Sequence, residues 1–193
     1  MSATLKIYCK NTGEYLPIHG GETLQEIANR LAPRLGTLQL ICAAVNNKTE
    51  PLQYQLFGPK QVEFLSKNSP SGARVYVRSL CMMLYYAVKK GFPGLRLRIE
   101  HSIAGGYYCR LFTSQKENQD TTLNLSPAPE EMPEITSRLL EIMRDIQRRD
   151  IPFERKERLT SDIIEKFREA DLPDKVELLE TTHELYTTYY RLD

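Results

Sequence analysis

The N-terminal third of the chain constrains the fold most, because its hydrophobic pattern changes between period two and helical spacing at clear turn signals. Residues 4–10 alternate apolar and polar side chains, the turn sequence Asn11-Thr12-Gly13 follows, and residues 14–18 continue the extended pattern. Such alternation on both sides of a short glycine-containing turn is typical of a β-hairpin. The chain is therefore predicted to begin with two antiparallel strands.

A short helix is predicted directly after this hairpin. Gly20-Gly21 interrupt the strand pattern, and Thr23 with Glu26 three residues later matches a capping box. The helix would cover residues 24–31, and further strands are predicted at 38–45, 52–56 and 62–65. The order ββαβββ indicates a small β-grasp module, in which one helix crosses a mixed sheet.

The rest of the chain predicts a second module of mixed structure. Residues 75–90 carry apolar side chains at helical spacing, and residues 95–100 and 107–112 alternate around Gly105-Gly106, which predicts a hairpin. After a polar, proline-containing loop the pattern predicts a helix at 134–149, a strand at 152–159, and helices at 161–170 and 175–179. The predicted fold class is α+β, with domains at 1–67 and 74–193 joined by a polar linker at 68–73.

The first module resembles the TGS family, the ubiquitin-like β-grasp domains of threonyl-tRNA synthetases and of some GTPases and kinases. Three features carry the resemblance: the short helix after the glycines, the Cys-Ala-Ala-Val-Asn-Asn strand and turn at 42–47, and the closing Val-Glu-Phe-Leu strand at 62–65. The resemblance covers residues 4–67. It implies a unit that binds RNA or a regulator, and it carries over no catalytic residue.

The second module resembles the second additional domain of threonyl- and alanyl-tRNA synthetases, which is their editing domain. The resemblance rests on Arg78-Ser79, Phe92-Pro93, the His-Ser-Ile-Ala-Gly-Gly-Tyr-Tyr segment at 101–108, and Ile151-Pro152-Phe153. It implies a two-layer α+β domain. The same pair of modules precedes the catalytic domain of a bacterial family of uridine kinase-like nucleoside kinases. The segments at 45–50 and 98–109 resemble that family most.

The synthetase editing chemistry depends on a His-x-x-x-His pair on the first helix, a Cys and a third His, which together can hold a metal ion or position a water. Alignment through Phe92-Pro93 places Arg78 and Met82 at the two histidine positions and Tyr190 at the cysteine position, and the chain reaches Asp193 before a final histidine. Arg cannot ligate a metal, and Met is a poor zinc ligand. We therefore predict no catalytic and no metal-binding residues in this chain.

Other catalytic signatures are missing as well. The sequence contains no G-x-x-x-x-G-K-[ST], no G-x-S-x-G and no Cys-His nucleophile pair. The four cysteines are widely scattered, which indicates reduced and mostly buried thiols. We predict no cofactor in this chain; the kinase resemblance implies ATP and Mg²⁺ for a catalytic domain of the parent protein that lies outside these residues.

The charge distribution singles out a candidate binding region. Residues 71–112 carry seven Lys or Arg against one Glu, whereas residues 113–193 carry 12 basic against 19 acidic residues. Arginines with interleaved tyrosines can contact phosphates and stack on bases. Arg96, Arg98 and Glu100 would share one side of the predicted strand. The candidate ligand-binding residues are Arg78, Arg96, Arg98, His101, Tyr107, Tyr108 and Arg110.

Several interpretations of this region stay open. The basic residues could form a solvated sheet face paired with the acidic helices, could dock a neighbouring kinase catalytic domain of the same parent chain, or could bind a nucleotide or RNA. The leading hypothesis is a non-catalytic accessory or regulatory region of a uridine kinase-like nucleoside kinase. The alternatives are an editing-type aminoacyl-tRNA deacylase, with a site rebuilt around His101 and Cys109, and a sequence-independent RNA-binding module.

The remaining predictions concern location and partners. No run of about 18 apolar residues is present to span a membrane. The N-terminus has no basic segment leading into an apolar one, so no secretory signal is predicted. We therefore expect a cytoplasmic protein with no membrane partner, and we expect no DNA partner.

Overall fold

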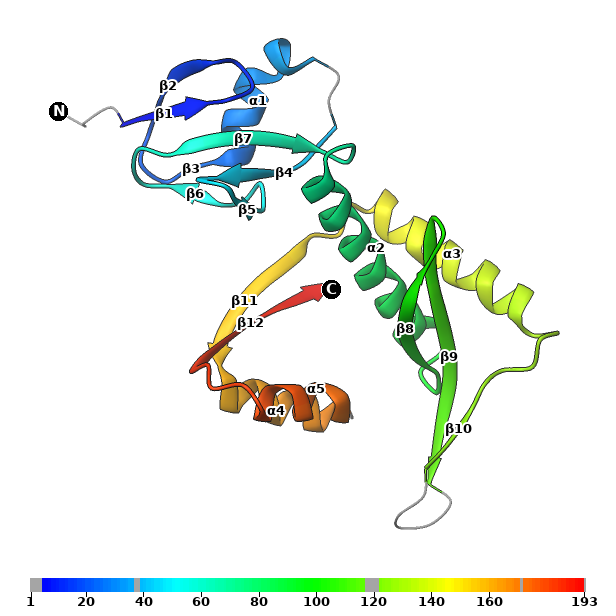
Figure 1. Cartoon of the computed structure of the whole chain (residues 1–193). Coiled ribbons are helices and arrows are strands. Elements are labelled where there is room, and N and C mark those ends of the chain that lie inside the picture. Colours follow the sequence, from blue (N-terminus) through cyan, green and yellow to red (C-terminus); the bar gives the residue numbers. More distant parts are fainter. Residues whose placement is uncertain (1–4, 37–38, 117–121, 171, 193) are drawn as a thin grey trace. The chain divides into compact units, whose positions relative to one another are not determined.

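The computed structural model describes residues 5–36, 39–116, 122–170 and 172–192, with the side chains of 114–124 left undescribed. Thr4 and Leu38, at which two strands were predicted to begin, and Asp193 lie outside these ranges. The chain divides into two compact units, Met1–Met82 and Met83–Asp193. Helices and strands are mixed in both units, which confirms the predicted α+β class (Figure 1).

The first unit is built on a five-stranded sheet in the order β2-β1-β7-β4-β5. The central pair β1–β7 is parallel and the other pairs are antiparallel, so the sheet is mixed, as predicted. The elements are β1 (Leu5–Cys9), β2 (Glu14–Ile18), β3 (Glu22–Thr23), α1 (Leu24–Leu35), β4 (Leu40–Val45), β5 (Lys48–Glu50), β6 (Gln55–Leu56) and β7 (Gln61–Ser66).

The predicted capping box begins α1. The Thr23 side chain accepts a hydrogen bond from the Glu26 backbone N–H, and the Glu26 carboxylate accepts one from the Thr23 N–H at 2.7 Å. The bond from the Thr23 N–H, together with one that the Thr23 hydroxyl donates to the same carboxylate at 2.8 Å, holds the pKa of the Glu26 carboxyl below its usual value. The helix runs four residues further than predicted and ends at Gly36, whose φ of 68° lies in the left-handed region.

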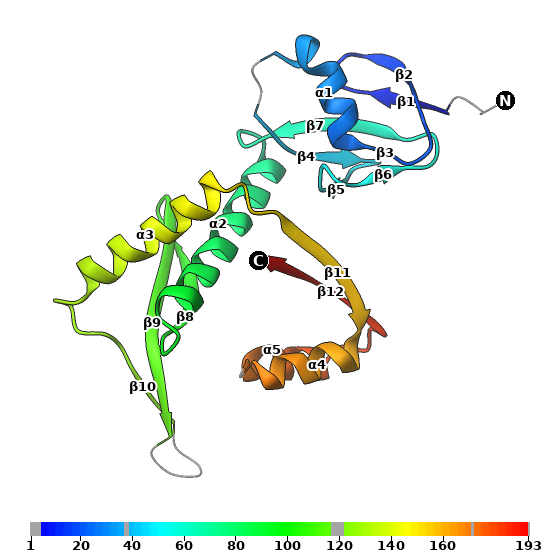
Figure 2. The same cartoon turned by 180° about the vertical axis from the view of Figure 1, so that it is seen from behind.

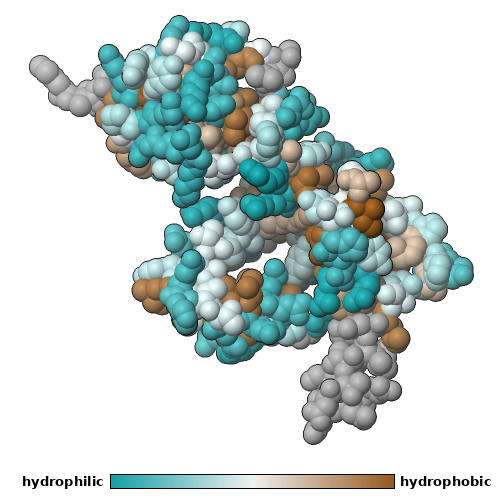
Figure 3. Space-filling view, in the orientation of Figure 1, coloured by the Kyte–Doolittle hydropathy of each residue, from teal (hydrophilic) through white to brown (hydrophobic). Residues whose placement is uncertain are grey.

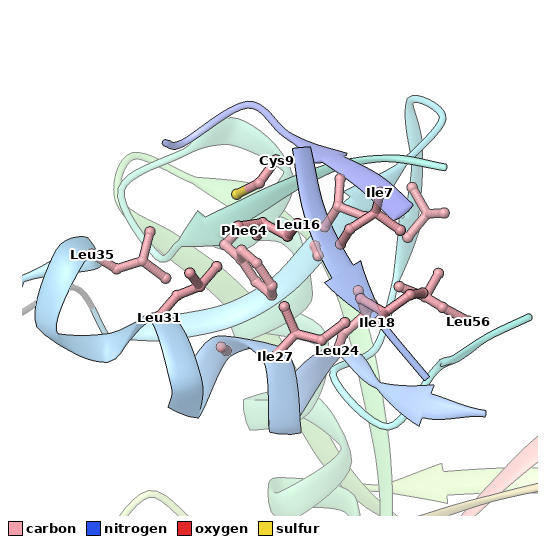
Figure 4. Close-up of a cluster of buried hydrophobic side chains, with 14 residues drawn as sticks. Ile7, Cys9, Leu16, Ile18, Leu24, Ile27, Leu31, Leu35, Leu56 and Phe64 are labelled. Atoms are coloured by element: carbon pink, nitrogen blue, oxygen red, sulfur yellow. The ribbon is translucent and has the colours of Figure 1, made fainter. Parts of the chain in front are cut away.

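The apolar face of α1 covers the sheet and closes the core of the first unit (Figure 4). Side chains from β1, β2, α1, β6 and β7 point into one cluster, which includes Ile7, Ile18, Leu24, Ile27 and Phe64. Ile7, Leu24 and Ile27 have no exposed surface. Burial of this kind stabilises a fold by about 1.5–3 kcal/mol for each large side chain.

The strand predicted at 52–56 is shorter in the structure, where only Gln55–Leu56 is extended and pairs with β3. The reason is the start of α1. The carbonyl of Tyr54 accepts a hydrogen bond from the Leu24 N–H, and that of Leu52 accepts one from the Gln25 N–H. Both donors belong to the first turn of a helix, which has no partners within the helix itself. These two carbonyl groups therefore accept hydrogen bonds from the first turn of α1 and do not pair with a neighbouring strand.

The second unit contains a three-stranded sheet, β10-β9-β8, and a separate two-stranded ribbon, β11–β12. The helix α2 (Pro70–Gly91) begins inside the predicted linker and continues across the boundary between the units. The other elements are β8 (Arg96–Ile103), β9 (Gly106–Lys116), β10 (Thr122–Leu125), α3 (Met132–Arg148), β11 (Phe153–Leu159), α4 (Thr160–Glu169), α5 (Pro173–Glu180) and β12 (Tyr186–Leu192).

Two strands of this unit were not predicted. The polar segment after Phe112 was expected to be a loop, yet β9 continues to Lys116 and β10 pairs with it. The sequence pattern predicts no element at 186–192, yet this run forms β12. β12 pairs with β11, from which α4 and α5 separate it in the sequence, and the local pattern does not display that partner. β10 pairs with β9, the element directly before it. In Figures 1 and 2 the C-terminal part of α2, the hairpin β8–β9 and α3 lie side by side. Gly91 of α2 lies against Ile142 of α3, so closely that an added Cβ would be 2.7 Å from the isoleucine.

Candidate functional site

Six of the seven predicted ligand-binding residues lie on the hairpin β8–β9, which is antiparallel as predicted. Arg96 is opposite Phe112, and Arg98 is opposite Arg110. Residues that face each other across an antiparallel pair point to the same side of the sheet. The arginine side of the hairpin therefore carries Phe112 as well.

A β-bulge changes the second half of β8. The register shifts between Ile99 and His101, so that His101 faces Tyr108 while Ile99 faces Cys109. One extra residue reverses the side to which all later residues point. The bulge thus brings His101 to the same side as the arginines. Simple alternation from Arg98 would place His101 on the opposite side. We call Arg96, Arg98, His101, Tyr108 and Arg110 the basic face.

Aromatic rings and guanidinium groups alternate along the basic face. The Arg98 and Arg110 guanidinium carbons lie 5.8 and 5.5 Å from the centre of the Phe112 ring. The rings of His101 and Tyr108 have centroids 5.5 Å apart and are tilted by 34°. Tyr108 is 47% exposed whereas Phe112 is 7% exposed. Phe112 therefore supports the arginines, and Tyr108 presents its ring to solvent.

Two arginines of the basic face have acidic neighbours. Arg98 lies 3.4 Å from a carboxylate oxygen of Asp174 on α5, and Arg110 Nε lies 3.8 Å from Glu100. The Asp174 contact agrees with the interpretation that the basic residues pair with the acidic helices. Arg110 Nε is shielded from solvent and has no hydrogen-bond acceptor among the described residues. Ion pairs this exposed are weak, so both guanidinium groups remain able to exchange partners.

Arg96 lies near enough to the helix α2 for its charge to act on Tyr85. Burial raises the pKa of the Tyr85 hydroxyl on α2, and the positive charge of Arg96 acts in the opposite direction. Arg96 is also only partly exposed. Of the three arginines, Arg98 and Arg110 are thus the better candidates for contact with a ligand.

The other two predicted residues lie elsewhere. Tyr107 is opposite Ser102, on the other side of the hairpin from the basic face. Arg78 is exposed on α2 and belongs to the first unit, whereas the other six residues belong to the second. Sequence reasoning did not include Phe112 or Asp174; the placement of Phe112 two residues after Arg110 could have indicated the former.

The rebuilt metal site does not form where it was suggested. His101 is on the basic face, while Cys109 is on the opposite side and donates a weak hydrogen bond to the Tyr107 carbonyl. Within the described residues, no group of three or more His, Cys, Asp or Glu side chains could hold a metal ion. Of the four cysteines, which were expected to be mostly buried, Cys9 and Cys42 are buried, Cys81 is half-buried and Cys109 is exposed.

A pocket beside this hairpin lies outside the basic face. It has a volume of about 430 Å³, is open to solvent, and is lined by the segment after α2, by β9 and β10, and by the residues around the start of α3, including Phe92, Leu95 and Ile135. None of the seven candidate residues lines it. Arg98, His101 and Tyr108 of the basic face are exposed, which suits an extended chain better than an enclosed small molecule.

Comparison with known proteins identifies relatives among tRNA synthetases. No family profile matches the chain. The threonine–tRNA ligase of Rubrobacter xylanophilus is 28% identical over 93% of this chain and 25% of its own length. That of Desulforamulus reducens is 31% identical over 82% of this chain and 23% of its own length. That of Carboxydothermus hydrogenoformans is 26% identical over 88% and 24%.

The chain thus spans about a quarter of the length of the curated relatives it matches, and the matching part is the N-terminal region of these ligases. This confirms the resemblance to a tRNA-synthetase-like pair of modules. These relatives give no support to the kinase resemblance. Among the residues that the structure describes, no helix is long and apolar enough to cross a membrane.

Proposed function

We propose that this chain is a non-catalytic, RNA-binding accessory module of the tRNA-synthetase type. The observation that carries the proposal is the basic face of β8–β9, where Arg98 and Arg110 lie opposite each other beside the exposed Tyr108 ring. Its relatives are named threonine–tRNA ligases, and this likeness supports a structured RNA as the ligand.

The chemistry of the basic face fits single-stranded or terminal nucleotides. A guanidinium group donates two parallel hydrogen bonds to a phosphate, and an exposed aromatic ring stacks on a base of any identity. Arg98 and Arg110 occupy adjacent strands, and Tyr108 is two residues from Arg110 on the same face. Phosphate contacts would thus position the strand, and stacking would add affinity without base specificity.

Binding to unfractionated tRNA at increasing salt tests this proposal. Contact with two or three phosphates should lower the affinity by about tenfold between about 50 and 200 mM monovalent salt, because bound counterions are released on binding. Fluorescence anisotropy with labelled tRNA measures this slope. An affinity that does not change with salt would contradict a phosphate-contacting face.

A second prediction concerns the carboxylate that neutralises Arg98. Asp174→Asn removes the ion pair while it keeps the side-chain size, and tRNA affinity should rise by about threefold to tenfold because one more positive charge faces the phosphates. The matched control is Asp145→Asn, which removes the acidic partner of Arg148 and Arg149 at the end of α3. Equal effects of the two variants would show that only net charge matters.

The deacylase alternative makes a different prediction. Hydrolysis of a mischarged tRNA ester requires a positioned water or metal ion, and the positions aligned with the synthetase set hold Arg78, Met82 and Tyr190. We expect no turnover of seryl-tRNA and no bound zinc in the purified protein. Turnover that is lost in His101→Ala would favour the hydrolase and contradict the non-catalytic proposal.

The kinase parent stays a prediction supported only by the segments at 45–50 and 98–109. It implies that the reading frame continues beyond Asp193 into a G-x-x-x-x-G-K-[ST] segment, and that ATP, Mg²⁺ and a nucleoside such as uridine bind there. In that case the kinase domain would be a partner of this chain. Sequencing of the downstream frame tests this reading; a stop codon directly after Asp193 would exclude it.

A further inference from the structure

One face of the ribbon β11–β12 is largely exposed in the described chain. Phe153 is opposite Leu192, Arg155 opposite Tyr190, Glu157 opposite Thr188, and Leu159 opposite Tyr186. These residues share one side, because partners across an antiparallel pair point the same way. The helix α4 lies on the other side, where Lys166 is 5.7 Å from the Tyr189 ring centre.

This largely exposed side, which we call the ribbon face, is rich in large apolar side chains. Phe153 is 38%, Leu159 39%, Tyr186 55% and Tyr190 51% exposed, whereas Leu192 is buried. In Figure 3 hydrophobic surface is visible at the end of the ribbon that passes into α4. Two strands alone are marginally stable in water, and several large apolar side chains exposed on one face are typical of an interaction site.

Along β11 the ribbon face has a self-complementary order. At every second position it presents Phe153, Arg155, Glu157 and Leu159, that is apolar, positive, negative, apolar. A two-fold axis across the strands at the level of Lys156 would place Arg155 opposite Glu157 of the partner subunit, and Phe153 opposite Leu159 of the partner subunit. Every contact then occurs twice, as a closed two-fold interface requires.

We propose that the ribbon face is a homodimer interface, with a second copy of this chain as its occupant. Two pairs of opposite charges would lie between two apolar ends. Arg155 is held in place on this face, because its guanidinium donates to the Thr188 hydroxyl at 3.2 Å. On the other side of the ribbon, Lys156 and Glu154 form an ion pair 2.8 Å apart.

Charge and size support a second copy over a nucleic acid. The charges of Arg155 and Glu157 cancel, so the ribbon face has no excess of positive charge to attract phosphates. The exposed parts of the four apolar side chains amount to about 400 Å² in each copy, from typical side-chain areas. An interface of about 800–1,000 Å² in total is at the small end for specific complexes, so we expect a weak dimer with a Kd of tens of micromolar.

Charge reversal tests this interface by sedimentation equilibrium over about 5–500 µM protein, a range that brackets the expected Kd. Arg155→Glu alone and Glu157→Arg alone would each place like charges opposite one another, and each should raise the Kd at least tenfold. A mixture of the two variants restores opposite charges in the heterodimer, which should form at the wild-type affinity. The double variant Arg155→Glu/Glu157→Arg should also dimerise like the wild type.

The matched control is Arg158→Glu, which reverses a charge on the same strand but on the other side of the ribbon. Its Kd should equal that of the wild type. A wild-type protein that stays monomeric throughout the concentration range would overturn the proposal. So would single variants that dimerise normally, or a mixture of the single variants that remains monomeric, since charge pairing across the ribbon face is then absent.

Discussion

Reversal of the two opposed arginines on β8–β9 should weaken tRNA binding by at least about 100-fold. In Arg98→Glu/Arg110→Glu, two contacts to phosphate are lost and two negative charges take their place beside Glu100 and Asp174. Each lost phosphate contact also lowers the slope of log affinity against log salt by about one. Anisotropy titrations of the wild type and the double variant at several salt concentrations would measure both effects.

The matched control reverses two exposed arginines that also have acidic neighbours. Arg138 lies 2.6 Å from Glu141, and Arg148 lies 3.5 Å from Asp145, both on α3. Arg138→Glu/Arg148→Glu changes the net charge by the same amount and should weaken binding by less than about fivefold. If the two double variants lose equal affinity, long-range charge rather than the basic face holds the RNA.

The aromatic part of the basic face has its own test. Tyr108→Ala should weaken binding by about fivefold to 100-fold through the loss of one stacked base, with the salt slope unchanged. Tyr107→Ala, on the opposite side of the hairpin, removes an equally exposed ring and should leave the affinity unchanged. A matching loss in both variants would argue against stacking on this side.

The second large effect concerns stability. Asn11→Ala should lower the free energy of unfolding of the first unit by about 2–4 kcal/mol. The Asn11 side chain accepts a hydrogen bond from the Phe64 N–H at 2.7 Å and donates one to the Phe64 carbonyl at 3.0 Å. It thereby continues the parallel pairing of β1 with β7 beyond the last backbone bond. Alanine would leave both partly buried groups of Phe64 without a partner.

Urea denaturation followed by circular dichroism measures this loss. Asn11→Asp keeps the acceptor and loses the donor, so its loss should be smaller than that of alanine. Asn29→Ala serves as the control, because Asn29 contacts only an exposed Gln25 side chain on α1 in the bonds described; its effect should stay within about 0.5 kcal/mol. Similar losses in Asn11→Ala and Asn29→Ala would disprove the bridging role.

Local signals predicted most of the first unit correctly. The capping box of Thr23 and Glu26, the hairpin around Asn11-Thr12-Gly13 and the closing strand near 62–65 all depend on contacts between residues close in sequence or on strict alternation, and all are present. The segment at 52–54 is an exception, since its carbonyl groups bind the start of α1. That competition between a helix end and a strand is decided only when the two segments meet.

In the candidate site, too, local signals predicted some features, and pairing between segments decided the others. Alternation correctly placed Arg96 and Arg98 on one side of β8, and the glycine pair correctly predicted the hairpin. Alternation alone would have pointed His101 the other way. The bulge near Glu100 reverses the side to which the following side chains point, and no residue type in the segment indicates that a bulge is present. The pairing of Arg98 with Asp174 joins residues 76 positions apart, which charge counts could suggest only in general terms.

Two short strands of the first unit, β3 and β5, were not predicted. The sequence by itself determined the α+β class and, in the first unit, the opening hairpin, the helix α1 and the closing strand. These follow from residue identity and from periodicity, which act over a few positions. Only the tertiary structure decided which side chains share the basic face and the ribbon face. Such faces arise from strand register and from pairing between distant segments, and the free energies that select a register are summed over the whole sheet.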